Sequence, residues 1–272
     1  MTRRVVLCAD DYGLSTGVDE AIGELARRGR LSAVSCLTNA PAWPADGPQL
    51  TTPAPRVAVG LHFNLTEGRP LSPALRALWP ALPAVQRCIV AAHLGRLPLA
   101  AIADELAAQW AAFVAATGRA PDFIDGHQHV HHLPGIRALV LDWMLRRSQP
   151  PALRSTGRVS GPGYLLKRLA IEWTGGRALA RTLARQREVP HNTVLLGVYD
   201  FEEPDYRSLM QAWLARAPAA GGMIFCHPGR RSPEAARDAI AAAREREWAY
   251  IASDAFAADL QAAGVELAGL AP

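Results

Sequence analysis

Hydrophobic residues follow two patterns along the chain: short apolar runs, and longer stretches in which apolar positions recur every three or four residues. Short apolar runs bounded by turn residues predict strands, and the longer period predicts amphipathic helices. The first run, 4–9, is continuous rather than alternating, as in a strand buried on both faces. We expect strands at 4–9, 33–37, 57–61, 122–125, 152–154, 193–198 and 222–225.

Helices are expected between these strands. Ser15 is suited to cap a helix that ends near Gly29, and the clearest helix spans 99–118, with apolar residues at helical spacing. The stretch 41–55 resembles a loop with room for one helical turn, and the proline-rich stretch 68–83 an excursion over one rim. Further helices are predicted at 134–147, 205–217, 233–247 and from 254 onward.

The alternation of strands and helices predicts the α/β class with a parallel sheet. About seven strand–helix units fit a barrel better than a small open sheet. No internal repeat, low-complexity segment or obvious linker interrupts the sequence, so residues 1–272 are expected to form a single domain. The segment 155–190 is Arg-rich, contains a Gly-Pro-Gly sequence, and is expected to be an inserted or variable part of that domain.

Composition narrows the classes of protein. Half of the residues are apolar and 20% are charged, which supports a large core and excludes global disorder. The net charge of +4 comes without a basic stripe interleaved with aromatic residues, so no nucleic-acid partner is expected. The four cysteines lie far apart and are expected to be reduced.

The same sequence predicts a cytoplasmic protein. The apolar run near the N-terminus is too short for a signal peptide, and no apolar stretch approaches the roughly 20 residues needed to span a bilayer. We therefore expect no membrane span.

Four histidines lie within six residues, directly after the predicted strand 122–125. An extended backbone would place His127, His129 and His131 on one face, whereas a helical one would pair His127 with His131. Imidazole is the commonest metal ligand among side chains and also transfers protons near neutral pH. Four imidazoles packed so closely bring no clear benefit to a core, so this cluster, which ends at His132, predicts a functional site.

Polar residues also follow the other predicted strands: Asp10 and Asp11, His62 and His227 each come after a strand. Taken singly, the two acids are more often turn or capping residues, and His62 and His227 are equally well explained as rim or turn histidines. However, the carboxyl ends of parallel strands lie at one face, where ligand sites form. We therefore expect these residues to meet the histidine cluster.

Their chemistry is that of a metal-dependent hydrolase. One carboxylate and two imidazoles on a divalent ion leave positions open for water and substrate. Of the adjacent acids Asp10 and Asp11, one can bind the metal while the other takes a proton from water. His227, from another strand, is placed to protonate a leaving amine.

Four motifs together resemble the YdjC-like (ChbG/HpnK) carbohydrate deacetylases. They are Ala9-Asp-Asp-Tyr-Gly13, Gly60-Leu-His-Phe-Asn-Leu-Thr66, Asp125-Gly-His-Gln-His-Val-His131 and Cys226-His-Pro-Gly229. The resemblance extends from residue 4 to about 230. It implies a deformed TIM-like barrel of the NodB type. It also implies metal-dependent hydrolysis of an N-acetyl group from an amino sugar such as a chitooligosaccharide, with release of acetate.

The resemblance also implies roles for individual residues. One divalent ion, Mg²⁺ or Zn²⁺, would be bound by Asp11, His62 and His127. Asp10 would be the general base, His227 the general acid, and Arg154 a partner of the base. The remaining residues of the pattern would lie in the second shell or contact the substrate, and these are Asp125, His129 and His131. Related enzymes often self-associate, so a homo-oligomer is expected.

Two other functions stay open. A metal-dependent phosphoesterase, or another barrel hydrolase, could use the same aspartate and histidine ligands, and only the resemblance opposes it. A metal-storing or sugar-binding protein without catalysis is the second alternative. The presence of both Asp10 and His227 argues against it, because a binding site needs neither a free base nor an acid opposite.

Overall fold

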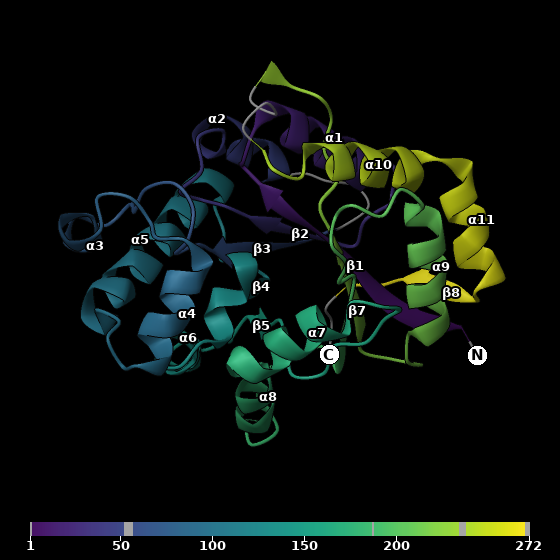
Figure 1. The fold of residues 1–272 in the computed structure, drawn as a ribbon. Helices are drawn as coiled ribbons and strands as arrows, with labels where there is room; N and C mark the ends of the chain where they lie inside the picture. The colour runs from purple at the N-terminus through teal and green to yellow at the C-terminus, as the bar shows by residue number, and fades with distance from the viewer. Residues whose placement is uncertain (1, 52–56, 187, 234–237, 270–272) are drawn as a thin grey trace.

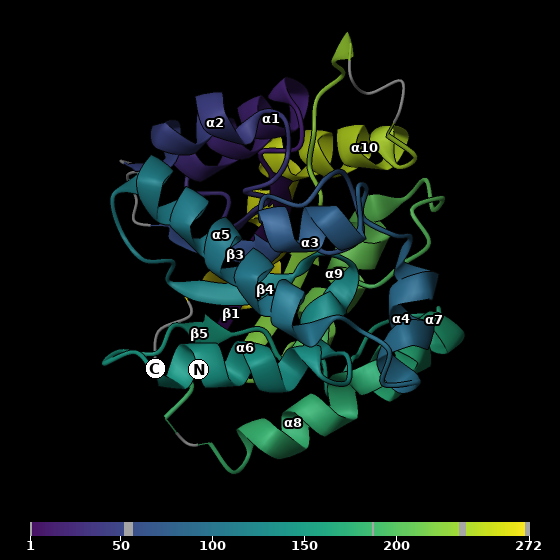
Figure 2. The ribbon, with the colours of Figure 1, turned by 90° about the vertical axis from the view of Figure 1, so that its left-hand side faces the viewer.

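Eight parallel strands form one curled sheet, and helices pack around its outer face (Figures 1 and 2). The structure is a computed structural model, which describes residues 2–51, 57–186, 188–233 and 238–269. The strands are β1 (Arg3–Tyr12), β2 (Ala33–Cys36), β3 (Ala58–Phe63), β4 (Phe123–Gly126), β5 (Ala152–Leu153), β6 (Val194–Leu196), β7 (Gly222–Cys226) and β8 (Val265–Leu267).

The sheet has the order β5-β4-β3-β2-β1-β7-β6, and β8 pairs with the start of β1. Its two edges, β5 and β6, are joined by isolated parallel bridges, Leu153 with His191 and Val159 with Leu195. The sheet is therefore curled into a barrel whose seam is held by scattered backbone pairs instead of a continuous ladder. The predicted α/β class and deformed barrel are confirmed.

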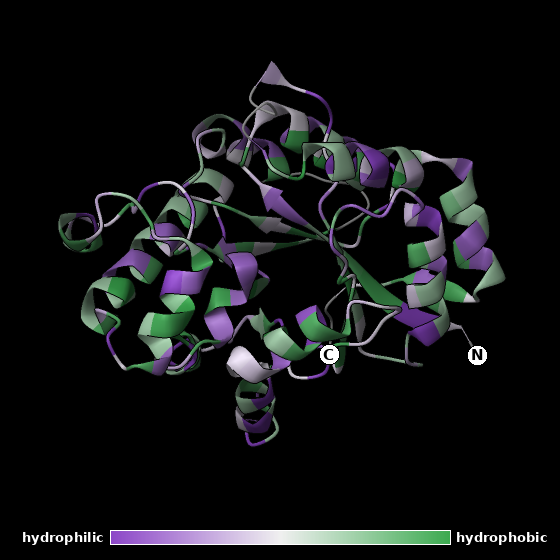
Figure 3. Ribbon diagram, in the orientation of Figure 1, coloured by the Kyte–Doolittle hydropathy of each residue, from purple (hydrophilic) through white to green (hydrophobic). Residues whose placement is uncertain are grey.

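Helices carry both hydrophobic and hydrophilic residues, as Figure 3 shows, and many of the hydrophobic ones are buried in the core against the sheet. Among the described residues the α-helices are α1 (Thr16–Arg27), α2 (Trp43–Asp46), α3 (Pro73–Leu78), α4 (Val85–His93), α5 (Leu99–Thr117), α6 (Ile136–Leu145), α7 (Leu165–Ile171), α8 (Arg177–Leu183), α9 (Tyr206–Arg216), α10 (Ala241–Ala252) and α11 (Asp254–Ala262). Shorter helical turns are η1 (Gly47–Thr51), η2 (His127–His132) and the π-turn η3 (Glu172–Gly176).

Strand residues alternate between two cores. On β1, Leu7 and Ala9 belong to the large core beneath the helices, whereas Val6 and Cys8 pack in a smaller apolar cluster inside the barrel. That inner cluster also takes side chains from strands across the barrel, such as Phe123 of β4. The barrel is thus filled by side chains, which leaves the carboxyl ends of the strands as the place for a site.

Several predicted boundaries were wrong. β1 runs on to Tyr12 and β3 to Phe63, so Asp10, Asp11 and His62 lie inside strands and not after them. The helix predicted from Pro134 starts at Ile136, and α4 and β8 were not predicted. Pairing with neighbouring strands extends β1 and β3 past the polar residues that suggested their ends.

The C-terminal helices also differ from the prediction. The helix expected at 233–247 is α10, which begins at Ala241 and runs to Ala252. Residues 234–237 lie outside the described part of the chain. α9 and α11 agree with the prediction to within a few residues.

Helix α5 is apolar enough, over 19 residues, to match a membrane span by length and composition, contrary to the sequence-based expectation. It is the one such helix in the described ranges. Two polar residues on it are buried and hydrogen-bonded: Glu105 accepts from the Ser72 amide at 2.7 Å, and Gln109 donates to the Asn64 carbonyl at 2.7 Å. In this fold α5 is a core helix packed on β3, α3 and α6.

Candidate metal centre and active site

The inward positions of five strand ends carry polar side chains. They continue the rows that begin with apolar residues deeper in the barrel, as Cys8 precedes Asp10 on β1 and Phe123 precedes Asp125 on β4. Each of these five side chains is at most 2% exposed. The row consists of Asp10, Ser35, His62, Asp125 and Arg154.

Asp11 joins this row because the backbone is distorted at that point. Alternation alone would turn Asp11 away from Asp10, but its φ is 74° and the pairing of β1 with β2 shifts between Ala9 and Tyr12. One carboxylate oxygen, Oδ1, then lies 3.1 Å from His127 Nδ1 and 3.5 Å from His62 Nε2. The irregularity brings both adjacent acids to one site.

The three side chains fit a metal ion. Ligand atoms of Asp11, His62 and His127 all lie within 4.8 Å of one another, and all three residues are buried. A metal–ligand distance of about 2.1 Å places neighbouring ligand atoms roughly 3.0–3.4 Å apart, close to the separations seen here. The predicted ligands are therefore brought together in a geometry that a divalent ion can use.

Carboxylates orient both imidazoles. Asp125 Oδ1 lies 2.6 Å from His62 Nδ1 and accepts a hydrogen bond from Ser35 Oγ at 2.5 Å, which leaves His62 Nε2 facing Asp11. Glu67 Oε2 lies 2.9 Å from His127 Nε2, which leaves Nδ1 facing Asp11. Carboxylates on the far nitrogen of metal-binding histidines fix the ring and its tautomer, so both contacts suit a metal centre.

The site attracts positive charge. Burial opposes protonation of His62, but Asp125 and Asp10 outweigh it and raise the pKa of His62 to about 10. Burial likewise opposes ionisation of Asp11, but Arg244 and then His127 hold the pKa of that carboxyl well below its usual range. A cation is electrostatically favoured where these side chains meet.

Asp10 is held by Arg154. The guanidinium donates two hydrogen bonds of 2.6 Å, one to each oxygen of Asp10, and its Nη2 also lies 2.6 Å from Asp125 Oδ2 and 3.2 Å from Cys8 Sγ. Cys8, Asp10 and Asp125 would themselves form a cation site, but the Arg154 guanidinium already lies among them. Asp10 is thus left as an oriented carboxylate beside the candidate metal.

His227 follows β7, with its ring between Phe201 and Phe225 at centroid distances of 5.2 and 5.5 Å. Its backbone amide donates to Glu247 Oε2 at 2.5 Å. Burial lowers the pKa of His227 to about 4, although Asp11 and Asp10 act in the opposite direction. The ring is therefore neutral at pH 7 in this state of the protein.

The histidine cluster forms neither the extended strand nor the regular helix considered above. It is a tight turn, η2, in which Gln128 and His129 have positive φ. His129 faces the Phe225 ring at 5.5 Å, His131 Nε2 lies 2.9 Å from the Arg154 carbonyl, and His132 Nδ1 lies 2.8 Å from Thr156 Oγ1. Of the four imidazoles, only His127 is placed with Asp11 and His62.

A cavity of about 860 Å³ opens onto these residues. Asp10, Asp11, His62, His127 and His227 all line it, as does His129. Much of the remaining wall is apolar and comes from distant segments, including Leu14, Ile89, Ile171, Phe201 and Ile240. Ile171 belongs to α7, so the Arg-rich segment 155–190 supplies part of the wall.

Three residues of the site were missed by sequence reasoning. Ser35 continues the inward row of β2 after Ala33, so strand alternation could have identified it. Glu67 directly follows the motif that contains His62. It lies in a loop, so no strand or helix period could have identified it. Arg244, on α10, is 5% exposed and donates from Nη2 to Asp11 Oδ2 at 2.8 Å, a contact that bridges 233 residues of sequence.

The fold and site define a class: a parallel barrel whose strand ends carry a buried Asp-His-His cation centre beside an Arg-held aspartate. A family model described as YdjC-like protein matches residues 4–262. The chain therefore belongs to the YdjC-like family, as the motifs predicted.

Known proteins with similar sequences are chitooligosaccharide deacetylases. That of Yersinia enterocolitica (serotype O:8 / biotype 1B) is 38% identical over 151 residues, which are 55% of this chain and 59% of the relative. That of Klebsiella pneumoniae (strain 342) is 38% identical over 182 residues, which are 64% of this chain and 68% of the relative. The chain thus spans about six tenths of the length of the first of these relatives.

Among solved structures, a "putative cellobiose-phosphate cleavage protein" from Enterococcus faecalis V583 superposes with a TM-score of 0.75 at 20% sequence identity. The superposition covers 99% of this chain and 98% of that one. At this identity the likeness concerns the fold, which it confirms over the whole chain.

Proposed function

We propose that this protein is a metal-dependent carbohydrate N-deacetylase, which hydrolyses the N-acetyl group of an amino sugar and releases acetate. The observation that carries the proposal is the arrangement in one cavity of a candidate metal triad, an Arg-held aspartate and a partly buried histidine, His227. The relatives named above are chitooligosaccharide deacetylases, which supports the same reaction for this chain.

Asp11, His62 and His127 would hold the metal. A divalent ion there supplies a Lewis acid for the amide carbonyl and lowers the pKa of water. Nitrogen ligands suit Zn²⁺, whereas a carboxylate with open positions also suits Mg²⁺, so both ions stay in the proposal. Arg244 and Asp125 keep two of the ligands in place through their contacts with Asp11 and His62.

Asp10 acts as the general base in this proposal. It takes a proton from the attacking water, and the two hydrogen bonds from Arg154 fix the direction in which its carboxylate faces. Because Arg154 stays charged at all physiological pH values, Asp10 keeps this orientation throughout turnover.

His227 acts as the general acid. Its ring is neutral before substrate arrives, because burial lowers its pKa to about 4. Negative charge that develops on the substrate beside it raises the affinity of the imidazole for a proton. The imidazole then takes up a proton from the solvent in the cavity and passes it to the leaving nitrogen, while the proton that Asp10 removed from the attacking water is released to solvent.

An N-acetylated sugar suits the cavity. The polar floor of the cavity binds the acetamide group of the sugar, while Phe201 and the apolar walls can stack on the less polar face of the sugar ring. The volume of about 860 Å³ is in the range of pockets that enclose ligands larger than a monosaccharide. We infer a substrate that carries at least one further group beyond the deacetylated residue.

The test is acetate release from N-acetylglucosamine, chitobiose and lipid-linked amino sugars, with and without a chelator. We expect release from at least one of them, loss of release on chelation, and recovery when metal is restored. Full activity in metal-free protein would refute the metal dependence. Release of phosphate from a matched panel of phosphate esters, with no acetate from any amide, would favour the phosphoesterase alternative.

Asp10→Asn tests the division of roles between the acids. We expect turnover to fall by about 10³-fold or more, since the variant lacks the base, while the metal content stays near that of the unmodified protein. Loss of the metal in Asp10→Asn, with retention in Asp11→Asn, would show that the two roles are reversed.

A further inference from the structure

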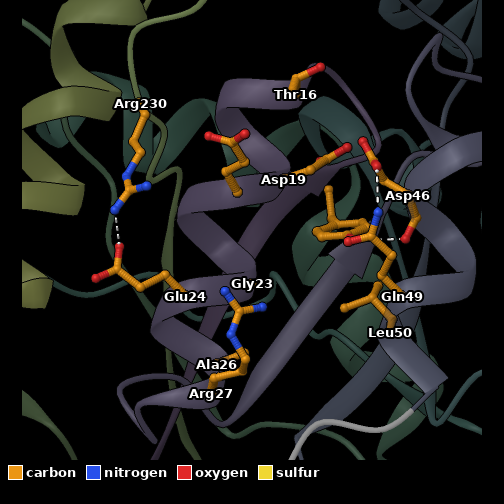
Figure 4. Close-up of a pocket in the computed structure, with 12 residues that line it drawn as sticks. Thr16, Asp19, Gly23, Glu24, Ala26, Arg27, Asp46, Gln49, Leu50 and Arg230 are labelled. Atoms are coloured by element: carbon orange, nitrogen blue, oxygen red, sulfur yellow. Dashed lines mark hydrogen bonds and ion pairs between the residues drawn. The ribbon is translucent and has the colours of Figure 1, made fainter.

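A second cavity, of about 500 Å³, lies beside α1 and α2 and behind the end of β1 (Figure 4). None of its lining residues lines the active-site cavity. Its walls carry the carboxylates of Asp19 and Glu20 on α1 and of Asp46 on α2, together with the Tyr12 side chain. This cavity therefore gathers negative charge away from the proposed catalytic groups.

Asp19 is the unusual residue in this cavity. It is 5% exposed, and its Oδ1 accepts a hydrogen bond of 2.6 Å from the Gly13 amide. Its Oδ2 is buried and has no hydrogen-bond partner within the described part of the chain. Figure 4 shows this side chain extending toward Asp46. A buried carboxylate oxygen with no donor is costly, so it calls for a bound cation or a proton.

The neighbouring charges strengthen this requirement. Burial raises the pKa of Asp19 to about 8, and the Asp46 carboxylate adds to the rise, while the Gly13 hydrogen bond opposes it. The two arginines of the cavity lie elsewhere: Arg230 pairs with Glu24 at 2.5 Å, and Arg27 lies beside Gly23. Within the described residues, no basic side chain compensates the pair of aspartates.

We propose that Asp19 and Asp46 bind a hard divalent cation, Ca²⁺ or Mg²⁺, between their carboxylates. The carboxylates offer oxygen atoms, which these ions prefer, and no imidazole or thiol is among the residues that line the cavity. Gln49 Nε2 donates to Asp46 Oδ1 at 2.9 Å, so we expect the ion to bind the other oxygen of Asp46. The cavity has room for the water molecules that Mg²⁺ usually retains and that complete the shell of Ca²⁺.

Such a cation would strengthen the turn that follows the metal ligand Asp11. Asp19 holds the Gly13 amide, and the Asp46 carbonyl accepts a hydrogen bond of 2.9 Å from the Tyr12 hydroxyl. Both ligands of the proposed cation thus hold the two residues directly after Asp11. The site is structural, and its existence does not depend on the proposed deacetylation.

The test uses micromolar Tb³⁺ as a luminescent substitute for Ca²⁺ in the full chain at pH 7.5, where Tb³⁺ stays in solution and binding displaces the proton from Asp19. Tyr12 lines the cavity, so excitation of aromatic residues should sensitise Tb³⁺ bound there. Competition with Ca²⁺ and Mg²⁺ then gives their affinities. We expect Asp19→Asn and Asp46→Asn each to weaken binding about tenfold or more, because affinity follows the number of charged ligands.

Both substitutions keep the hydrogen bonds that hold Gly13 and Tyr12, so the variants should fold. Glu20→Gln is the matched control, since it removes a carboxylate from the same cavity without touching the pair. An equal loss in Glu20→Gln would show attraction by general negative charge and overturn the proposal. Unchanged binding in Asp19→Asn and Asp46→Asn would overturn it as well.

A variant of the candidate metal centre separates the two sites. In His62→Ala/His127→Ala we expect the Asp19-dependent Tb³⁺ signal to persist, whereas binding at the metal centre is lost. Disappearance of the whole signal in this variant would mean that the second cavity binds no cation. A stability gain in Asp46→Asn, with no Tb³⁺ signal and no stabilisation by Ca²⁺ in the unmodified protein, would instead show that the aspartates share a proton.

Discussion

Asp11 has an uncommon backbone conformation in the active site. Its φ of 74° is uncommon for a residue with a side chain, although aspartate tolerates it better than most. Such a conformation costs roughly 1–3 kcal/mol and persists only where several contacts enforce it. Here His62, His127 and Arg244 all contact the carboxylate. Of these three residues, Arg244 is not itself a candidate metal ligand.

Arg244→Met should lower the affinity for the metal about 10–100-fold, the usual effect of losing a partner of a metal ligand. The guanidinium bridges Asp11 Oδ2 at 2.8 Å and Asp238 Oδ2 at 2.5 Å, so its loss leaves the buried Asp11 carboxylate and the partly exposed Asp238 carboxylate without their cation. The measurement is a metal titration against a chelating indicator.

Arg244→Lys should recover part of the affinity, because it restores a positive charge without the planar fork. Arg207→Met is the matched control, since Arg207 also pairs with an aspartate, Asp259, but far from the site. Equal metal affinity in Arg244→Met and the unmodified protein would show that Asp11 is held without Arg244.

At the scale of the element, the register of β3 and β4 places the site residues. His62 is the pairing partner of Asp125, and two residues earlier Gly60 is the partner of Phe123. A Cβ at Gly60 would lie 2.4 Å from the Phe123 ring. The glycine therefore makes room for the ring that fills the barrel beneath the candidate metal centre.

Gly60→Ala should destabilise the protein by about 1–3 kcal/mol, the usual cost of forcing a methyl group into a packed core. Gly23→Ala is the matched control. On α1, a Cβ at Gly23 meets only the flexible end of Arg27, at 3.2 Å, so the change should stabilise the protein by roughly 0.5–1 kcal/mol. Denaturant unfolding measures both effects, and a neutral Gly60→Ala would contradict this account of β3.

Glu247, on α10, contacts the amide of His227 just after β7, and its buried carboxyl predicts that the stability of the protein depends on pH. Burial raises the pKa of Glu247 from its ordinary value of 4.5 to about 7, although hydrogen bonds from Tyr199 and the His227 amide oppose the rise. The folded state therefore binds a proton that the unfolded state releases. The contribution of this proton to the free energy of unfolding is present in full below pH 4.5 and is lost as the pH rises through about 7.

Glu247→Gln should remove this dependence. Between pH 5 and pH 8 the unmodified protein should lose about 2–3 kcal/mol more unfolding free energy than the variant. Denaturant unfolding of both proteins at several pH values gives the difference between their unfolding free energies. The contributions of the other titrating groups are the same in both proteins and cancel in this difference. Parallel stability curves for the two proteins would show that Glu247 ionises at its ordinary pKa.

At the scale of the whole molecule, the barrel depends on its seam. β5 and β6 share no continuous ladder, and Asn192 crosses between them. Its Oδ1 accepts from the Ser155 amide at 2.7 Å and its Nδ2 donates to the Ser155 carbonyl at 2.9 Å. Ser155 follows Arg154, so the seam also positions the partner of Asp10, the proposed general base.

Asn192→Ala should destabilise the protein by about 2–4 kcal/mol, because it leaves two buried backbone groups of Ser155 without partners. It should also reduce turnover, since Arg154 loses its support. Thr193→Ala, at the next residue on an exposed side chain, should change stability by less than about 0.5 kcal/mol. An intact melting temperature in Asn192→Ala would show that the bridges alone close the barrel.

The sequence by itself determined where the strands lie and which of their ends carry reactive groups. Apolar runs are readable without a structure, and parallel strands place their carboxyl ends at one face. Asp10, His62, His127 and His227 could therefore be assigned to one site from four separated motifs. The alternation of strands and helices predicted the α/β barrel, and the resemblance of the four motifs predicted the family.

The tertiary structure decided what surrounds these groups. Arg244 reaches Asp11 from a helix 233 residues away, Glu67 reaches His127 from a loop, and Asp19 meets Asp46 in the second cavity. None of these contacts follows a strand or helix period, because each depends on how separate elements pack. Backbone distortion at Asp11 and in η2 likewise arises from packing, and it selects His127 from the four histidines as the imidazole that faces Asp11.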